Sequence, residues 1–210
     1  MKEYHKIETL YERDITGSKK LIEGKFCNET VEFLKDNIWV FTEKIDGTNV
    51  RIHWDGHKVT FGSRTERSSI PADLMNYLIA TFGDEDTEQV FEQKFGEKEV
   101  TLYGEGYGPK IQKVGGLYRS DVSFILFDVL IGDMWLTRGS VEDIAVAFGI
   151  DVVPEVLTGT LAEAVEFVKK KPLSEIGTAP MEGVVGRPMV EVLDRRGRRV
   201  IVKIKARDFK

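Results

Sequence analysis

Hydrophobic and polar positions alternate with a period of two along several stretches of the chain, which predicts β-strands. The clearest stretch is 38–61, where β-branched and apolar residues dominate and Asp55-Gly56 separates two alternating runs, a pattern typical of a two-residue hairpin turn. Further strands are predicted at 100–103, 123–130, 189–193 and 199–206, with a turn at 195–198 between the last two. The run at 123–130 is apolar on both faces, so it is expected to lie inside a sheet.

Two of the predicted strands carry polar residues on one face and apolar residues on the other. In the first stretch, period-two spacing separates Asn49, Arg51 and His53 from Val50, Ile52 and Trp54. Near the end of the chain, it separates Lys203, Lys205 and Arg207 from Val200, Val202, Ile204 and Ala206. Each of these strands therefore has one face suited to a core and one face suited to binding or chemistry.

Apolar residues at helical spacing predict four helices, at 28–35, 72–81, 141–148 and 161–170. Ser140 and Thr160 stand directly before the last two and are expected to be their N-caps. Strands and helices together indicate an α+β fold. We expect one domain over residues 1–210, because no internal repeat and no linker rich in proline, glycine or serine divides the chain.

The composition is that of a folded protein. Of the 210 residues, 41% are hydrophobic, 10% aromatic and 31% charged, which supplies a core and excludes a disordered chain. No apolar run approaches the roughly 20 residues of a membrane span, and the N-terminus has no apolar signal-peptide region. The single cysteine, Cys27, cannot form an internal disulfide. We therefore expect a cytoplasmic protein with no membrane attachment, and a phage or viral protein would have the same features.

Charge is unevenly distributed along the chain. The net charge of −5 argues against a general nucleic-acid binder. Residues 195–210, however, contain eight Lys and Arg against one acid, and residues 84–99 contain seven acids against two lysines. The basic segment can offer a cationic surface to phosphates, although such charge runs are more often simply solvated faces.

Lys44 is the first candidate for chemistry. It ends a hydrophobic strand and is followed at once by the turn at Gly47, which is expected to expose its amine at the mouth of a pocket. An amine attacks an electrophile only when it is deprotonated, a state that nearby cations or desolvation favour. A lysine at a hairpin turn is usually no more than a solubilising residue, so the other residues must decide.

Lys203 and Lys205 are the second candidates. Two lysines on one face of a strand with an apolar back suit a phosphate clamp, and their charge would favour the deprotonated form of Lys44. The alternative is an edge strand whose lysines protect it from aggregation.

Several other residues suit a nucleotide or a metal. Glu105 ends a strand between two glycines, which would let the backbone approach a ligand and the carboxylate accept ribose hydroxyls, although it could also be an ordinary loop residue. Asp128 lies in an apolar strand and needs a partner there, and its neighbour Phe127 belongs either to the core or to a base-stacking platform. Glu182 suits Mg²⁺, and Arg64 suits a phosphate or ribose.

The order and spacing of these stretches resemble the motifs of the covalent nucleotidyltransferase superfamily of polynucleotide ligases and mRNA capping enzymes. The closest resemblance is to the ATP-dependent RNA ligases of the phage RNA-repair and kinetoplastid RNA-editing type. The matching stretches are EKIDGTN at 43–49, SRT at 63–65, LYGEGYG at 102–108, FILFDV at 124–129, EGVV at 182–185 and VKIK at 202–205. The resemblance implies an ATP-grasp-like nucleotidyltransferase fold, with antiparallel sheets flanked by helices, over nearly the whole chain.

The resemblance also implies a role for each matching residue. Lys44 would attack the α-phosphate of ATP and form a lysyl-AMP phosphoramidate. Glu43 would read the adenine amino group, Phe127 would stack on the base, and Glu105 would bind the ribose. The AMP would then pass to a 5′-phosphorylated RNA end, and a neighbouring 3′-OH would displace it to seal the strand.

The remaining roles concern phosphates and metal. By the same resemblance, Asn49 and Arg64 would contact the phosphate or ribose region and the RNA end. Lys203 and Lys205 would neutralise the α-phosphate, and Glu182 would help to hold Mg²⁺ or Mn²⁺. This is charge stabilisation and alignment, the chemistry that phosphoryl-type transfer requires.

Alternatives with the same first step are an ATP-dependent DNA ligase and a capping guanylyltransferase. Those enzymes usually have arginine where this chain has Asn49, so the GTN turn favours RNA over DNA. A non-catalytic nucleotide- or RNA-binding module is a different class, and it would be expected to lack Lys44 or one of the lysines of VKIK, all of which are present.

The chain ends a few residues after VKIK, and we expect no appended C-terminal domain. It would then be either a minimal ligase or an isolated adenylyltransferase domain, a monomer for which a partner or an added domain could supply further grip on RNA. The basic segment 195–210 could provide part of that grip. A histidine metal site is not indicated, and His53 and His57 are expected to be exposed strand residues.

Overall fold

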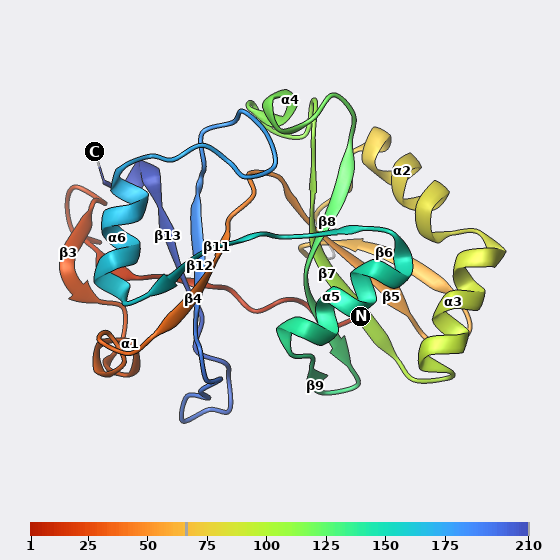
Figure 1. Ribbon diagram of the computed structural model, residues 1–210, viewed down its shortest axis with the longest axis horizontal. Helices are drawn as coiled ribbons and strands as arrows, with labels where there is room; N and C mark the ends of the chain where they lie inside the picture. The colour runs from red at the N-terminus through yellow and green to blue at the C-terminus, as the bar shows by residue number, and fades with distance from the viewer. Residues whose placement is uncertain (66, 210) are drawn as a thin grey trace. The chain divides into compact units, whose positions relative to one another are not determined.

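The computed structural model describes residues 1–65 and 67–209, in which largely antiparallel strands form sheets with helices packed on them (Figure 1). The chain divides into two units. Unit 1 comprises Met1–His5 and Asp46–Val153, and unit 2 comprises Lys6–Ile45 and Pro154–Lys210. The α+β class predicted from the sequence is confirmed, whereas the single domain over residues 1–210 stays a prediction.

Unit 1 is built on a six-stranded sheet in the order β10-β8-β7-β5-β6, with β9 beside β8. The strands are β5 (Thr48–Trp54), β6 (Val59–Ser63), β7 (Val100–Tyr107), β8 (Ser123–Ile131), β9 (Met134–Trp135) and β10 (Asp151–Val152). All neighbours are antiparallel except β10, which runs parallel to β8. The inner strand β8 is buried on both faces, as predicted.

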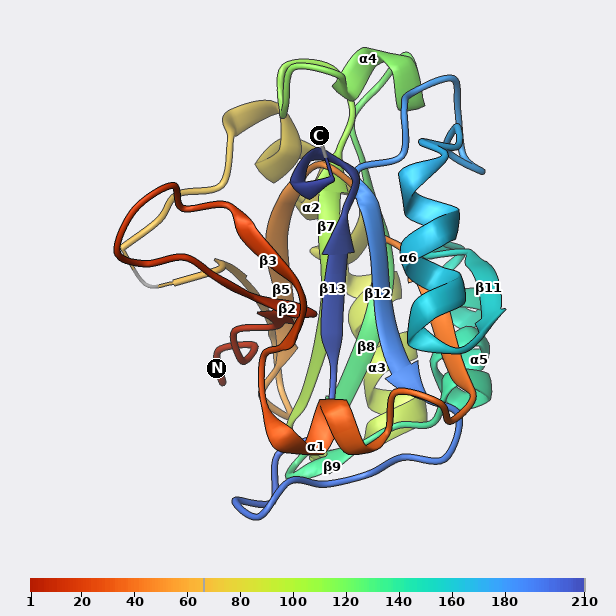
Figure 2. The same cartoon turned by 90° about the vertical axis from the view of Figure 1, so that its left-hand side faces the viewer.

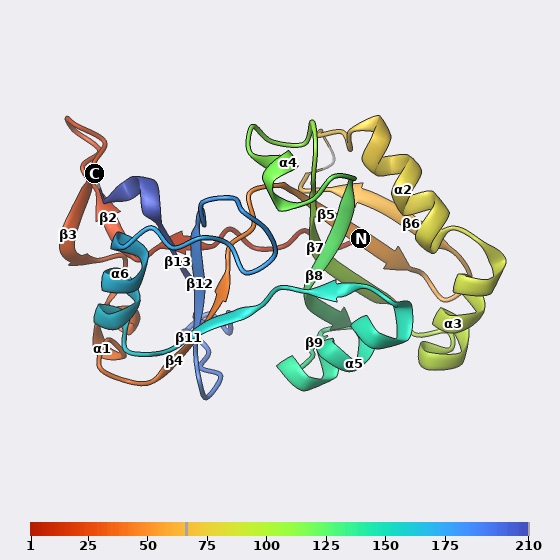
Figure 3. The same cartoon turned by 45° about the horizontal axis from the view of Figure 1, so that its top comes forward.

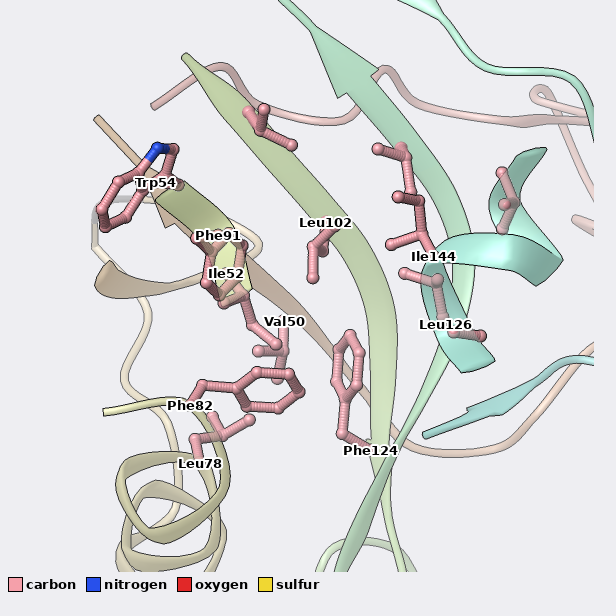
Figure 4. Close-up of a cluster of buried hydrophobic side chains, with 14 of the residues drawn as sticks. Val50, Ile52, Trp54, Leu78, Phe82, Phe91, Leu102, Phe124, Leu126 and Ile144 are labelled. Atoms are coloured by element: carbon pink, nitrogen blue, oxygen red, sulfur yellow. The ribbon is translucent and has the colours of Figure 1, made fainter. Parts of the chain in front are cut away.

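Helices cover one face of this sheet. They are α2 (Ala72–Phe82), which leads into α3 (Glu85–Phe95), and α5 (Arg138–Phe148), with the short α4 (Gly115–Tyr118) in the loop between β7 and β8 (Figure 3). Figure 4 shows side chains that meet in this core, among them the fully buried Val50, Ile52, Phe82, Phe91 and Phe124. Burying a side chain of this size stabilises the fold by about 1.5–3 kcal/mol relative to leaving it exposed.

Unit 2 is built on a five-stranded sheet in the order β1-β13-β12-β4-β11. Its strands are β1 (Glu8–Thr9), β4 (Trp39–Glu43), β11 (Glu155–Gly159), β12 (Gly183–Pro188) and β13 (Val202–Lys205), and β2 (Tyr11–Arg13) pairs separately with β3 (Leu21–Phe26). Its helices are α1 (Glu29–Phe33), α6 (Leu161–Lys169), which packs against β12 and β13 (Figure 2), and a 3₁₀ helix (Ala206–Asp208). The core includes Trp39, Phe41, Val165, Val184 and Val202.

The four predicted helices all form. α2 and α6 match their predicted ranges to within one residue, and α1 is shorter than predicted. α5 begins at Arg138 with Thr137 at its N-cap, so the assignment of Ser140 as N-cap is wrong. α3 was not predicted. It begins directly after Asp84, whose carboxylate accepts a hydrogen bond from the Thr87 N–H at 2.7 Å.

The hairpin predicted around Asp55 and Gly56 joins β5 to β6. Its connection has four residues, 55–58, and not the two that were predicted. The reason is local: the Asp55 carboxylate accepts hydrogen bonds from the N–H groups of His57 and Lys58, both at 3.0 Å, and Gly56 takes a positive φ of +99°. The turn residues were therefore right and the turn length was wrong.

The predicted strand at 189–193 is wrong. The strand in this region is β12, which begins earlier and ends at Pro188. Met189 and Val190 are 57% and 77% exposed, so their apolar side chains mark no core face. The turn predicted at 195–198 is confirmed, because the Asp194 N–H donates to the Arg198 carbonyl at 2.7 Å.

The N-cap of α6 allows a test of local stability. The Thr160 side chain accepts a hydrogen bond from the Glu163 N–H, and the Glu163 carboxylate accepts one from the Thr160 N–H, which is a complete capping box. We expect Thr160→Ala to lower the free energy of unfolding by about 1 kcal/mol, measured by urea denaturation. Thr137→Ala at the head of α5 is the matched control, because Thr137 makes no capping hydrogen bond and its loss should cost less.

Candidate active site

Lys44 lies at the end of β4 in unit 2, where three neighbouring strands meet. The pairing of β4 with β12 places Glu43 opposite Val184, and the Lys44 N–H donates to the Gly183 carbonyl at 2.9 Å. β12 in turn pairs with β13, which places Gly183 opposite Lys205. The sheet register therefore brings the ends of β4, β12 and β13 together around Glu182, the residue just before β12.

Glu182 bridges two of the predicted site lysines. One carboxylate oxygen lies 2.5 Å from Lys44 Nζ, and the other lies 2.6 Å from Lys205 Nζ. The three side chains are only 14% to 23% exposed, so water screens them poorly. Burial raises the pKa of the Glu182 carboxyl, but the two ammonium groups outweigh it and the net pKa is lowered. The cluster therefore combines one carboxylate with two lysines, and an anion that replaced the carboxylate would meet both cations.

β13 carries Lys203 and Lys205 on the face opposite the buried Val202 and Ile204, as the alternation predicts. The strand pairs with β1 on one side and β12 on the other, so the alternative of an edge strand is wrong. Arg207, predicted for the same face, does not lie on the strand, because the strand ends at Lys205 and the chain turns into the 3₁₀ helix.

Glu43, directly before Lys44, is a buried carboxylate with only 2% of its surface exposed. Its Oε2 accepts a hydrogen bond from the Glu175 N–H at 2.9 Å, whereas its Oε1 is buried with no hydrogen-bond partner among the described residues. Burial raises the pKa of Glu43, and hydrogen bonds from Ser174 and from the Glu175 backbone only partly offset it. A buried acceptor with spare capacity suits a donor on a ligand. Ser174 and Glu175 were not predicted, since nothing local links them to Glu43.

The raised pKa of Glu43 predicts a pH-dependent stability. Because the fold favours the neutral carboxyl, the wild-type side chain contributes stability below its ordinary pKa and loses it as pH rises through the folded-state pKa. We expect Glu43→Gln, which does not ionise, to be more stable relative to the wild type at pH 7.5 than at pH 4, measured by urea denaturation. Glu191→Gln, at an exposed residue of the same unit, is the control, and a stability difference that does not change with pH would contradict the prediction.

Asn49 and Glu105 lie in unit 1, directly opposite each other on β5 and β7. The Oδ1 atom of Asn49 is buried with no hydrogen-bond partner among the described residues, and Glu105 is half-buried. The structure thus brings these two predicted residues together on one face of the sheet.

The glycines beside Glu105 have a different role from the one predicted. A Cβ at Gly104 would lie 2.2 Å from the Phe124 ring, and a Cβ at Gly106 would lie 2.2 Å from Leu74. Both glycines therefore allow close packing within the core rather than the approach of a ligand.

Phe127 is half-buried on β8, and Asp128 beside it is fully buried. The Tyr4 hydroxyl donates to Asp128 Oδ2 at 2.7 Å, and the Tyr4 ring packs edge-on against Phe127 at a centroid distance of 5.2 Å. The buried aspartate therefore has the partner that its strand requires. Tyr4 was not predicted as this partner, because it lies 124 positions away from Asp128 along the chain.

The other candidate residues lie on or beside β5 and β6 of unit 1. Arg64 is exposed just beyond β6. His53 is only 7% exposed, so its predicted exposure is wrong: its ring contacts Thr101 Oγ1 at 3.0 Å and Glu99 Oε1 at 3.1 Å, and burial lowers its pKa. Arg51 is also buried, with Nε donating to the Ser63 carbonyl at 2.8 Å.

Among residues 1–65 and 67–209, no group of three or more His, Cys, Asp or Glu side chains could hold a metal ion.

The sequence of residues 37–205 matches the RNA ligase family model, which covers most of the chain. The chain therefore belongs to the RNA ligase family, and the resemblance predicted from its motifs is confirmed. No curated protein matches the sequence. No helix within the described part of the chain is long and apolar enough to cross a membrane.

Solved RNA ligases from Naegleria gruberi have a similar fold. A variant with ATP and Mn aligns with a TM-score of 0.63 and 17% identity over 86% of this chain and 52% of that one. A variant with AMP and Mn aligns with a TM-score of 0.64 and 17% identity over 97% of this chain and 62% of that one. The ligase with PPi aligns with a TM-score of 0.62 and 19% identity over 100% of this chain and 63% of that one. The nucleotidyltransferase fold is thus confirmed, and the chain spans between 52% and 63% of the length of these ligases.

Proposed function

We propose that this protein is an ATP-dependent RNA ligase that carries AMP covalently on Lys44. The observation that supports this most is the Lys44–Glu182–Lys205 cluster, at 2.5 and 2.6 Å, in a chain of the RNA ligase family. Lys44 and Lys205 both bind the Glu182 carboxylate. A nucleophilic amine with a second cation beside it suits attack on a phosphate, which would take the place of the carboxylate between the two lysines.

In the first step, Lys44 Nζ forms a bond to the α-phosphorus of ATP while the bond to the β-phosphate oxygen breaks and pyrophosphate leaves. The amine must lose a proton for this, and Glu182 Oε2 lies within hydrogen-bond distance of it. Lys205 and Lys203 stabilise the negative charge that builds up on the α-phosphate. Glu43 Oε1, buried and without a partner among the described residues, accepts a hydrogen bond from the adenine amino group and so favours ATP over GTP.

The resemblance of the motifs to those of RNA ligases supports further contacts with the nucleotide. Phe127 stacks on the base, Glu105 binds the ribose, and Asn49 and Arg64 contact the phosphate or ribose region and the RNA end. The pairing of Asn49 with Glu105 across β5 and β7 supports a shared role for those two residues.

A divalent cation belongs to this proposal, since related ligases are solved with ATP and Mn. Glu182 supplies the hard oxygen ligand that Mg²⁺ or Mn²⁺ prefers. Among the described residues, no group of three or more His, Cys, Asp or Glu side chains could hold a metal ion, so Glu182 would share the ion with other ligands. Mg²⁺ is often held by one or two carboxylates together with substrate phosphates and water. The ion would offset charge on the nucleotide, and Glu182 would hold it.

The later steps act on RNA. A 5′-phosphate oxygen attacks the lysyl-AMP phosphorus and releases Lys44, which gives an AMP-capped RNA end. A neighbouring 3′-OH then attacks the RNA phosphate, AMP leaves, and the phosphodiester is complete. We propose a cytoplasmic monomer in which AMP loading needs only this chain, while a partner or added domain improves the grip on RNA.

Intact-mass spectrometry tests the proposal. Incubation with ATP and Mn²⁺ should add the mass of one AMP, and GTP should add nothing. A nicked RNA duplex with a labelled 5′-phosphate should then be sealed, and a DNA 3′-OH strand should be joined less well. No added mass in protein that starts free of AMP would overturn the proposal, addition of GMP would indicate a capping-type enzyme, and a preference for DNA would indicate a DNA ligase.

A further inference from the structure

The turn that follows Lys44 is held by a loop that lies between the matching motifs of the family. This loop joins β7 to β8, comprises residues 108–122 and contains α4. Two of its side chains bind the backbone of the turn: the Tyr118 hydroxyl accepts a hydrogen bond from the Asp46 N–H at 3.2 Å, and Gln112 Nε2 donates to the Gly47 carbonyl at 3.0 Å. All four residues belong to unit 1.

The Tyr118 side chain is fixed by its surroundings. It is only 4% exposed, and its ring meets the Tyr107 ring edge-on at a centroid distance of 6.0 Å. The Tyr107 hydroxyl accepts a hydrogen bond from Arg119 at 3.3 Å, and Arg119 makes a two-pronged contact with Asp121 at 2.7 and 3.1 Å. The Tyr107 ring and the Arg119–Asp121 ion pair therefore restrict the Tyr118 side chain to few conformations.

The loop is also closed on itself. A Cβ at Gly108 would lie 2.3 Å from the Asp121 carbonyl oxygen, so the two ends of the loop touch, and a Cβ at Gly115 would lie 1.8 Å from the Gly108 carbonyl oxygen, so the start of α4 packs closely on the start of the loop. Gly108 itself takes a φ of +118°, which favours glycine. Tyr118 therefore projects from a rigid frame and not from a loose loop.

The turn has little freedom where Tyr118 binds it. A Cβ at Gly47 would lie 2.3 Å from the Gly106 carbonyl oxygen, so the turn presses on β7. On the other side, the Lys44 N–H is bound to the Gly183 carbonyl. Only Ile45 separates Lys44 from Asp46 along the chain. A shift of the Asp46 backbone therefore passes almost directly to the residue that carries the amine.

We propose that Tyr118 is a positioning residue, which fixes the backbone of the turn after Lys44 through its hydrogen bond with the Asp46 N–H. This inference rests on the proposed function, in which Lys44 is the nucleophile. Transfer reactions depend steeply on alignment, and a displacement of about 1 Å can cost 10²-fold in rate. Tyr118 touches neither ATP nor the reacting atoms in this scheme, and it acts through the main chain.

The test is Tyr118→Phe, which keeps the buried ring and removes the acceptor. We expect amide hydrogen exchange at Asp46 to become faster, the maximal rate of AMP loading to fall about 10-fold, and the ATP concentration for half-maximal rate to stay unchanged. Tyr77→Phe is the matched control: its hydroxyl accepts from Ser123 at 3.4 Å, also in unit 1 but away from the turn. It should change neither the exchange at Asp46 nor the loading rate.

The outcomes separate this inference from the proposed function. Unchanged exchange at Asp46 in Tyr118→Phe overturns the inference, and so does faster exchange with an unchanged loading rate. A rise in the half-saturating ATP concentration alone also overturns it, because it would assign Tyr118 to nucleotide binding. If the wild type takes up no AMP, the proposed function fails, and hydrogen exchange still decides whether Tyr118 holds the turn.

Discussion

Replacing Lys44 with arginine or alanine is expected to abolish covalent AMP loading, with a fall in rate of at least ~10³-fold. Lys44 Nζ is the atom that forms the bond to phosphorus, and a guanidinium stays protonated in proteins and cannot replace it. Arginine keeps a positive charge facing Glu182, so Lys44→Arg separates the loss of the nucleophile from the loss of the ion pair at 2.5 Å. The measurement is the time course of intact mass with ATP and Mn²⁺.

Two controls sharpen this result. Lys35→Ala removes an exposed lysine of the same unit and should load AMP like the wild type. RNA that already carries AMP on its 5′-phosphate bypasses the step that needs Lys44, so Lys44→Ala should still seal it. AMP loading of Lys44→Arg at the wild-type rate would place the nucleophile elsewhere in the chain.

The residue types of the site were more predictable than their partners. Lys203 and Lys205 share a face because alternation is a local property of a strand, and β13 confirms it. Lys44 was singled out by the turn that follows it. The partner of Lys44 could not be predicted, because Glu182 lies 138 positions away and alternation does not say which strands pair. For the same reason, Tyr4 could not be predicted as the partner of Asp128, which is 124 positions away.

The helix α3 was missed for a different reason. Its sequence is so acidic that it reads as a solvated charge run, and only Phe91 and Phe95 on it are buried. Asp84 is a good N-cap residue, and the two phenylalanines that follow it are four positions apart, which is helical spacing. These two features indicate a helix, but the acidic composition of the segment favoured the interpretation as a solvated charge run. The error did not affect the site, because α3 covers the core face of unit 1, while Asn49 and Glu105 lie on the other face of its sheet.

Burial was the property that the sequence predicted least well. His53 was expected to be exposed and Arg51 to lie on a face suited to binding, yet they are only 7% and 3% exposed. The N-terminal residues bind Arg51 and its cross-strand neighbour Tyr103: Arg51 donates to the Met1 carbonyl at 3.3 Å, and Tyr103 donates to the Lys2 carbonyl at 2.9 Å. A strand face is therefore solvated only where no distant segment covers it, which is a tertiary property.

Replacing Glu182 with glutamine is expected to damage both stability and activity. Glutamine is similar in size but uncharged, so the ammonium groups of Lys44 and Lys205 would face each other without a counter-ion in a site that is largely shielded from water. We expect the free energy of unfolding at pH 7 to fall by about 1–3 kcal/mol and AMP loading to fall about 10²-fold. If Glu182 also holds the divalent ion, the Mn²⁺ concentration for half-maximal loading should rise.

The pH dependence distinguishes the ion-pair role of Glu182 from a general loss of packing. The pKa of Glu182 is lowered in the fold, so its contribution to stability is present above the ordinary pKa of a glutamate and is lost as pH falls through the folded-state pKa. The stability difference between wild type and Glu182→Gln should therefore shrink on acidification from pH 7, measured by urea denaturation at each pH. Glu191→Gln, at an exposed residue of the same unit, should show no such trend. A difference that persists undiminished in acid would contradict the prediction, because it would mean that the charge of Glu182 is not what stabilises the two lysines.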